Sequence, residues 1–157
     1  MITEIQRDEA SLSIIRYLLG APLPDASLAH AAAKWLVAGA DNPGIVALAG
    51  LSAKASDWEV RDIALNVLEE LEILGEDDSN QFDTLASYLV RSIVRYPDKA
   101  EEYSKLLWRL ARRHQEEVRT EDLDELIGLA SSWDEPYADQ LGEALEDAAR
   151  RYLKGRQ

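Results

Sequence analysis

The sequence predicts an all-α fold of about eight helices in antiparallel hairpins, either a compact bundle or a short, irregular stack. Three observations support this prediction. Apolar residues recur at helical spacing along almost the whole chain. Capping residues precede most of these stretches, and glycine follows several of them. No run of alternating β-branched residues is long enough for a strand. The links between helices are short, roughly 2–8 residues, which is typical of antiparallel neighbours.

Length and composition are those of one globular domain over residues 1–157. Hydrophobic residues make up 46% of the chain, which is ordinary for a folded protein. The sequence has no cysteine, so disulfides and thiolate chemistry are excluded. The first residues lack the basic and apolar regions of a signal peptide, and no apolar run approaches the ~18 residues that span a bilayer. We therefore expect a cytoplasmic protein.

Each helix is predicted from its apolar stripe and its end signals. The helices are expected at residues 9–19, 26–38, 43–50, 57–74, 80–95, 99–118, from 121 onward, and 135–153. Their expected N-caps are Asp8, Asp25, Asn42, Ser56, Ser79, Thr120 and Asp134. Gly20, Gly39 and Gly75 are expected to close the first, second and fourth helices.

The stretch WLVAGADNPGIVALAGL, from Trp35 to Leu51, contains the most motif-like residues in the chain. Gly39 is placed to end one helix, and Asn42 with Pro43 is placed to start the next. The apolar residues on both sides would pack the two helices together. We interpret the stretch as a corner rather than a binding or catalytic site.

The sequence offers little for metal binding or catalysis. The two histidines, His30 and His114, belong to neither an H-E-x-x-H nor a Glu-x-x-His motif. His114 shares an apolar stripe, and His30 lies among alanines, so packing roles are expected for both. A calcium loop starting at Asp77 fails, because Phe82 and Tyr88 occupy the positions that require Gly and Glu. No phosphate-binding glycine loop is present. We therefore predict a non-enzymatic protein with no cofactor and no metal.

The charge balance is acidic, with 30 Asp and Glu against 17 Lys and Arg and a net charge of −13. Such a protein is repelled by phosphate backbones, so nucleic acid is not an expected partner. The same charge speeds association with a basic protein. The segment 62–90 contains acids but no Lys or Arg, which indicates either solvated surface or a docking patch. The residues predicted to bind a partner are Asp62, Glu69, Glu70, Glu72, Glu76, Asp77, Asp78 and Asp83.

Two segments resemble known families. Residues Asp57 to Ala64 fit the D-x-x-V-R-x-x-A pattern of one helix of a HEAT repeat, although no second copy follows at a period of about 40 residues. The Trp35–Leu51 stretch fits W-L-x-x-G-x-D-[NS]-P-x-[ILV]-x-x-L-A-G-L, which is similar to a segment of small all-helical bacterial proteins. Some of these look like immunity proteins of polymorphic or contact-dependent toxin systems.

These resemblances imply a protein that neutralises a cognate bacterial toxin, such as a cationic nuclease, by direct binding. The alternative is a structural or adaptor helical module. The sequence leaves the oligomeric state and the identity of the partner open.

Overall fold

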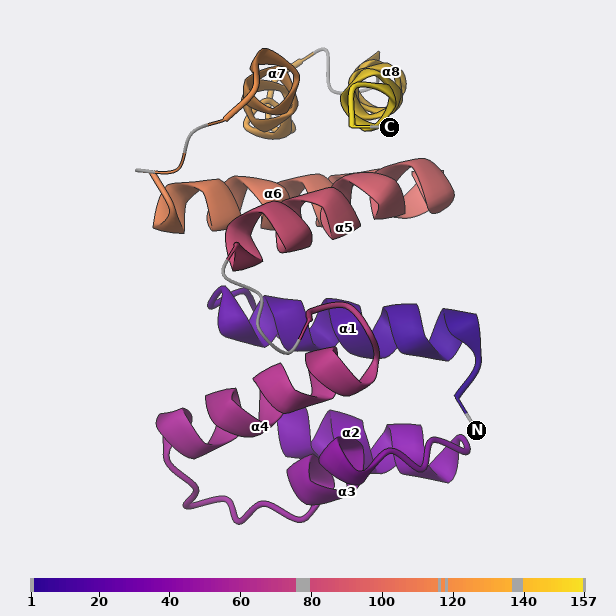
Figure 1. Ribbon diagram of the computed structural model, residues 1–157, viewed down its shortest axis with the longest axis vertical. Coiled ribbons are helices and arrows are strands. Elements are labelled where there is room, and N and C mark those ends of the chain that lie inside the picture. The colour runs from indigo at the N-terminus through magenta and orange to yellow at the C-terminus, as the bar shows by residue number, and fades with distance from the viewer. Residues whose placement is uncertain (1, 76–79, 116, 118, 137–139, 157) are drawn as a thin grey trace. The chain divides into compact units, whose positions relative to one another are not determined.

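The structure is a computed structural model that describes residues 2–75, 80–115, 117, 119–136 and 140–156. These residues form eight α-helices and one short 3-10 helix, with no strand among them (Figure 1). The elements are α1 (Glu4–Leu18), α2 (Leu28–Val37), α3 (Pro43–Ala49), α4 (Asp57–Glu70), α5 (Gln81–Arg95), η1 (Pro97–Lys99), α6 (Ala100–Arg113), α7 (Glu121–Ala130) and α8 (Leu141–Lys154). The predicted all-α class is confirmed.

Contacts divide the chain into two compact units, Met1–Asp78 and Ser79–Gln157. The first contains α1 to α4, and the second contains η1 and α5 to α8. The single domain expected over residues 1–157 stays a prediction.

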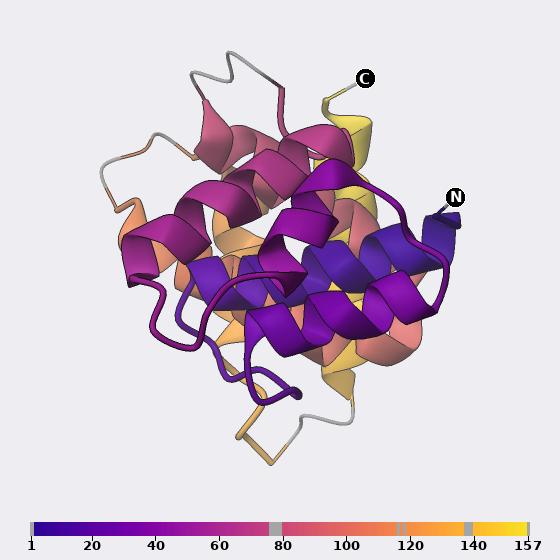
Figure 2. The same ribbon diagram turned by 90° about the horizontal axis from the view of Figure 1, so that it is seen from below.

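In the first unit, α1 packs on α2 and α4, and α3 packs on α2 and α4. The helices α1 and α2 lie side by side and run in opposite directions (Figure 2). The core is made by apolar residues from all four helices. Those with no exposed surface include Ile14, Ile15, Ile45, Leu48, Val67 and Leu68.

The predicted corner in this unit is confirmed. Gly39 adopts a φ of 113°, and the N–H groups of Gly39 and Ala40 donate to the carbonyls of Leu36 and Trp35, both at 3.0 Å. This pattern closes α2 as a Schellman motif, for which glycine is favoured at positive φ. Pro43 then occupies the first turn of α3.

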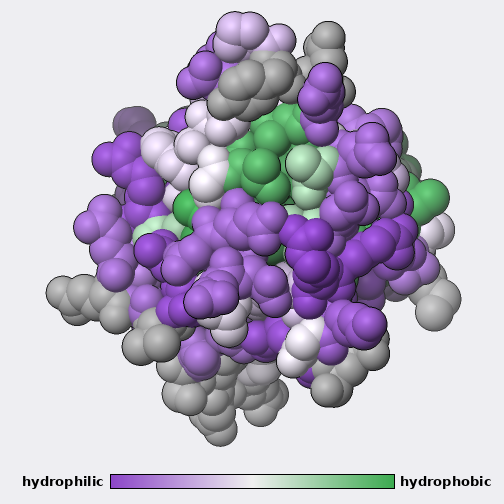
Figure 3. Space-filling view, turned by 90° about the horizontal axis from the view of Figure 1, so that it is seen from above, coloured by the Kyte–Doolittle hydropathy of each residue, from purple (hydrophilic) through white to green (hydrophobic). Residues whose placement is uncertain are grey.

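In the second unit, α5 packs on α6 and α8, and α7 packs on α6 and α8. The pair α7–α8 forms a layer that crosses the pair α5–α6 (Figure 1). The fully buried side chains include Leu89, Ile93, Leu107, Leu126 and Leu145. Viewed from the α7–α8 side, most side chains are hydrophilic, and the largest hydrophobic area in view lies near the centre of this face (Figure 3). No helix of the described residues is both long enough and apolar enough to cross a bilayer.

Two predicted N-caps in the first unit are wrong. The helix α1 begins after Thr3, whose hydroxyl accepts the Gln6 N–H while the Gln6 side chain accepts the Thr3 N–H. This capping box starts the helix five residues early and leaves Asp8 buried inside it. The helix α2 is capped by Ser27 instead of Asp25.

In the second unit, the predicted cap Asp134 is wrong and Ser79 lies outside the described residues. The helix α8 begins only at Leu141, because residues 131–136 form turns and Pro136 disfavours a helical conformation at the residue before it. The helix α5 is capped by Asn80, whose side chain accepts the Asp83 N–H at 3.2 Å. Thr120 caps α7 as predicted.

Two helices also end earlier than predicted. The helix α4 ends at Glu70 instead of residue 74, because Glu72 turns the chain at a φ of 61° before Gly75 is reached. The helix α6 ends at Arg113, where His114 leaves the helical conformation with φ −125° and ψ 49°.

Candidate functional site

The orientation of α4 is set by polar contacts with α1. The Tyr17 hydroxyl donates a hydrogen bond to the Asp57 carboxylate, and the Arg61 guanidinium donates to the Leu18 carbonyl at 3.2 Å. On the same side, Ala64, Val67 and Leu68 are fully buried. These contacts fix which side of α4 faces solvent.

The solvent side of α4 presents an aromatic ring followed by two carboxylates along the helix. Trp58, Asp62, Leu65 and Glu69 follow one another at spacings of four, three and four residues, so they lie along one stripe of the helix. We call these four residues the α4 outer face. Trp58 is 74% exposed, Asp62 is exposed, and Leu65 and Glu69 are half-buried. The stripe itself carries no cation, because the one arginine of α4 points to α1.

Two of the predicted acids therefore lie on the α4 outer face, Asp62 and Glu69. Glu72 is also exposed, just past the end of the helix. Glu76, Asp77 and Asp78 lie outside the described residues. Part of the predicted patch, Asp62, Glu69 and Glu72, thus lies at the surface of the first unit.

Two other predicted acids are already engaged within the chain. Glu70 accepts the Gly44 N–H with both carboxylate oxygens, at 2.9 and 3.0 Å. Asp83 belongs to the second unit, where both of its oxygens bind the Arg156 guanidinium. That contact raises the pKa of Arg156. A partner would have to break these contacts to use either carboxylate, so we leave both out of the site.

Trp58 is the residue that the sequence prediction missed. The signal was present, because Trp58 lies off the apolar stripe that Val60, Ile63, Ala64 and Val67 form at helical spacing. A large aromatic residue on the solvent side of an amphipathic helix is a candidate contact for a partner.

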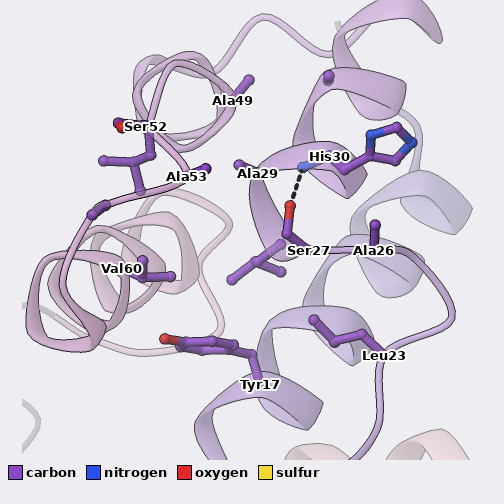
Figure 4. Close-up of a pocket in the computed structure, with 14 residues that line it drawn as sticks. Tyr17, Leu23, Ala26, Ser27, Ala29, His30, Ala49, Ser52, Ala53 and Val60 are labelled. Atoms are coloured by element: carbon purple, nitrogen blue, oxygen red, sulfur yellow. Dashed lines mark hydrogen bonds between the residues drawn. The ribbon is translucent and has the colours of Figure 1, made fainter.

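A cavity of about 550 Å³ opens on the opposite side of the first turn of α4 (Figure 4). Tyr17 and Val60 point toward it, and several alanines from α2 and the α3–α4 link surround it, whereas the His30 ring points away. The lining residues include Ala26, Ala29, Ala33, Ala49, Ala53 and Ala55. Small side chains at these positions leave the space open.

The polar groups at this cavity already have partners. The Ser27 hydroxyl accepts the His30 N–H at 3.1 Å, and the Ser52 hydroxyl accepts the Lys54 N–H at 3.0 Å. Burial raises the pKa of Tyr17 to about 12, with further contributions from its hydrogen bond to Asp57 and from the charge of Asp57. Tyr17 is therefore neutral near pH 7, and the cavity offers apolar contact rather than acid–base chemistry.

The histidines do not build a metal centre. Among the described residues, no group of three or more His, Asp or Glu side chains is placed to hold a metal ion. His114 is half-buried, and its ring lies 5.5 Å from that of Phe82, which fits the predicted packing role. His30 is exposed on α2, so the prediction that helix packing accounts for it is wrong.

No family model, curated protein or solved structure matches the chain. The resemblances of residues 35–51 and 57–64 to known families stay predictions.

Proposed function

We propose that the protein is a non-enzymatic binding module that holds a basic protein partner on the α4 outer face. The proposed class is an immunity protein that neutralises a cognate bacterial toxin, such as a cationic nuclease, by direct binding. The observation that supports this proposal is the 74% exposure of Trp58 on the same stripe as Asp62 and Glu69.

Two physical effects favour a basic partner on this face. Exposed tryptophan side chains bury a large area on binding, and a few such residues supply most of the energy of many interfaces. The carboxylates of Asp62 and Glu69 on the same stripe favour a basic partner and disfavour acidic ones. The net charge of −13 adds long-range attraction, which raises the association rate with a cationic protein. A cationic nuclease presents a basic surface made for phosphates, which carboxylates can occupy.

The test uses the toxin candidate encoded by the gene next to that of the protein. Its toxic domain is co-purified with the native chain and with Trp58→Ala, and the dissociation constant is measured by calorimetry. We expect Trp58→Ala to weaken binding by at least about tenfold, because truncating a central aromatic residue costs about 2 kcal/mol or more.

A charge variant tests the electrostatic contribution to binding. Asp62→Lys combined with Glu69→Lys should slow association most strongly at low salt, where charges are least screened. The matched control is Glu143→Lys combined with Asp147→Lys, since both are exposed carboxylates on α8 and the change in net charge is the same. The control should bind almost as tightly as the native chain.

The outcomes separate the two candidate functions. Tight capture with loss of toxicity, weakened by the α4 variants and not by the α8 control, supports an immunity protein. Capture of a basic domain that has no toxic activity favours the structural or adaptor module. Equal binding by the native chain and both α4 variants contradicts the proposed surface.

A further inference from the structure

A second charged stripe, of opposite sign, lies on the solvent side of α6. Lys105, Trp108, Arg109 and Arg112 follow one another at helical spacing, opposite the buried residues Tyr103, Leu107 and Leu110. We call these four residues the α6 outer face. Lys105 and Arg112 are exposed, and Trp108 and Arg109 are half-buried. Lys105 pairs with Glu101 one turn earlier on the helix at 3.4 Å, but both side chains are about half exposed, and such surface pairs are weak enough for a partner carboxylate to compete with Glu101.

The aromatic part of this face has a fixed geometry. The Arg112 guanidinium lies 4.9 Å from the centre of the Trp108 ring. Beside it, Trp133 donates its indole N–H to the buried Ser104 hydroxyl at 2.8 Å, and that hydroxyl donates to the Glu101 carbonyl at 3.0 Å. Both rings line an opening of about 320 Å³, together with Lys105 and Arg109. The face is therefore a preformed aromatic and cationic surface on an acidic protein.

The two outer faces place residues of opposite charge at the same spacing. Lys105, Trp108 and Arg112 of the α6 outer face occupy positions i, i+3 and i+7, and Asp62, Leu65 and Glu69 of the α4 outer face occupy the same positions. The end residues are about 10 Å apart along each helix axis, from a rise of about 1.5 Å per residue. Parallel helices would bring Asp62 to Lys105, Leu65 to Trp108 and Glu69 to Arg112.

We propose that the α6 outer face of one copy of this chain binds the α4 outer face of a second copy. The two ion pairs flank an apolar contact between Leu65 and Trp108, which is the arrangement of charges around an apolar seam in helix pairing. The contact joins two different surfaces, so it is heterologous and forms a closed ring or a chain of copies. The inference goes beyond the proposed function but uses the same α4 surface.

Two openings beside the α6 outer face contain carboxylates as well as cations. This mixture of charges favours a helix over a nucleic-acid backbone as the partner of the face. Asp134 lines the opening beside Trp108, and Glu117 lines a second opening of about 420 Å³ beside Arg112. A nucleic-acid backbone would meet these carboxylates along its path, and the net charge of −13 also repels it. A helix that places single carboxylates opposite Lys105 and Arg112 avoids the first of these costs, and salt screens the repulsion between the two acidic copies.

The experiment measures the mass of the full chain by sedimentation equilibrium at micromolar to millimolar concentration. An ionic strength of about 0.15 M gives a Debye length of about 8 Å, so the net repulsion between copies is largely screened while facing side chains still interact. We expect the native chain to associate reversibly. The variants Asp62→Lys with Glu69→Lys, and Lys105→Glu with Arg112→Glu, should each be monomeric alone, because like charges then face each other.

Mixing the two variants is the decisive step. Lysines on α4 of one variant then face glutamates on α6 of the other. The native α6 outer face of the first variant also faces the native α4 outer face of the second. Because both pairings join opposite charges, association should return to the native level. The same recovery is expected when all four substitutions are combined in one chain. The control Glu143→Lys with Asp147→Lys should associate as the native chain does. Circular dichroism confirms that each variant is folded.

Failure of this proposal is distinct from failure of the proposed function. A native chain that stays monomeric, or variants that stay monomeric when mixed, overturns self-association. Lys105→Glu with Arg112→Glu leaves the α4 outer face unchanged, so it should still bind a basic toxin domain at the native strength even where self-association is lost.

Discussion

The Glu70 carboxylate binds the backbone N–H of Gly44 with both oxygens, at 2.9 and 3.0 Å. Gly44 lies in the first turn of α3, where the Asn42 side chain provides no capping hydrogen bond. Glu70 therefore supplies from α4 the negative charge and the acceptors that the first turn of a helix needs. A Cβ added to Gly44 would lie 2.8 Å from Glu70 Oε2 and 2.8 Å from Val67 Cγ2, so the absence of a side chain permits this approach.

Replacing Gly44 with alanine should destabilise the protein by about 1–3 kcal/mol, the usual cost of overpacking a well-packed contact. The free energy of unfolding is measured by urea denaturation. The matched control is Gly50→Ala at the other end of α3, where a Cβ makes only ordinary contacts, 3.5 Å at the nearest. That control should be neutral or slightly stabilising. Equal effects of the two substitutions would show that the close approach at Gly44 does not matter.

Replacing Glu70 with alanine should cost about 1–2 kcal/mol, because it removes a charged acceptor from a backbone donor at a helix start. Glu69→Ala is the natural comparison, since Glu69 is the adjacent residue on the α4 outer face and is expected to change stability by less than about 0.5 kcal/mol. In partner binding the order should be reversed, and Glu69→Ala should weaken the affinity more than Glu70→Ala does. A destabilising Glu69→Ala together with a silent Glu70→Ala would reverse the roles assigned to these residues.

The end of α4 uses a residue that is poorly suited to its conformation. Glu72 has a φ of 61°, and its N–H and that of Ile73 donate to the carbonyls of Glu69 and Leu68. This is the Schellman position that glycine fills at the end of α1 and α2. Glu72→Gly should therefore stabilise the protein by about 0.5–1 kcal/mol, as measured by urea denaturation.

The same position provides a control for Glu72→Gly. Glu72→Ala removes the same carboxylate but keeps the Cβ, so it should bring no comparable gain. If alanine stabilised the protein as much as glycine, the loss of an acidic charge rather than relief of the backbone would be the cause.

The spacing of apolar residues and the capping residues predict the all-α fold and about eight helices. One apolar stripe at helical spacing is enough to identify each helix in the sequence. The helix ends are less well predicted, since several acceptable caps compete. Asp8 and Asp25 are good caps in isolation, but Thr3 and Ser27 are used instead. At the other end of a helix, the sequence indicates Gly75 as the residue that closes α4. The chain instead turns earlier, at Glu72, which adopts a positive φ although it is not glycine.

The site is predicted only in part for a similar reason. Asp62 and Glu69 follow from helical spacing within α4. The engagement of Glu70 by Gly44 and of Asp83 by Arg156 depends on contacts 26 and 73 residues apart in the chain, and no local pattern in the sequence reveals them. Trp58 could have been found, because its position on the helix already separates it from the apolar stripe.

The hydrogen bond from Tyr17 to Asp57 should make stability depend on pH in the alkaline range. The ordinary pKa of this group is 10.0, and burial, with the hydrogen bond and charge of Asp57, raises the pKa to about 12 in the folded protein. Between these values the unfolded chain has lost the proton while the folded chain retains it. Rising pH therefore favours unfolding, and stability is lost progressively from about pH 10 to about pH 12.

Tyr17→Phe isolates this effect, because the other titrating groups are common to both chains. Below pH 10 the variant should be less stable than the native chain by about 1 kcal/mol, the typical contribution of one hydrogen bond. The difference should shrink as the pH rises toward 12. Urea denaturation at several pH values measures it, and absorbance titration should show one late-ionising tyrosine fewer in the variant than in the native chain. A difference that stays constant up to pH 12 would mean that Tyr17 titrates as an ordinary tyrosine and does not hold α4 through its proton.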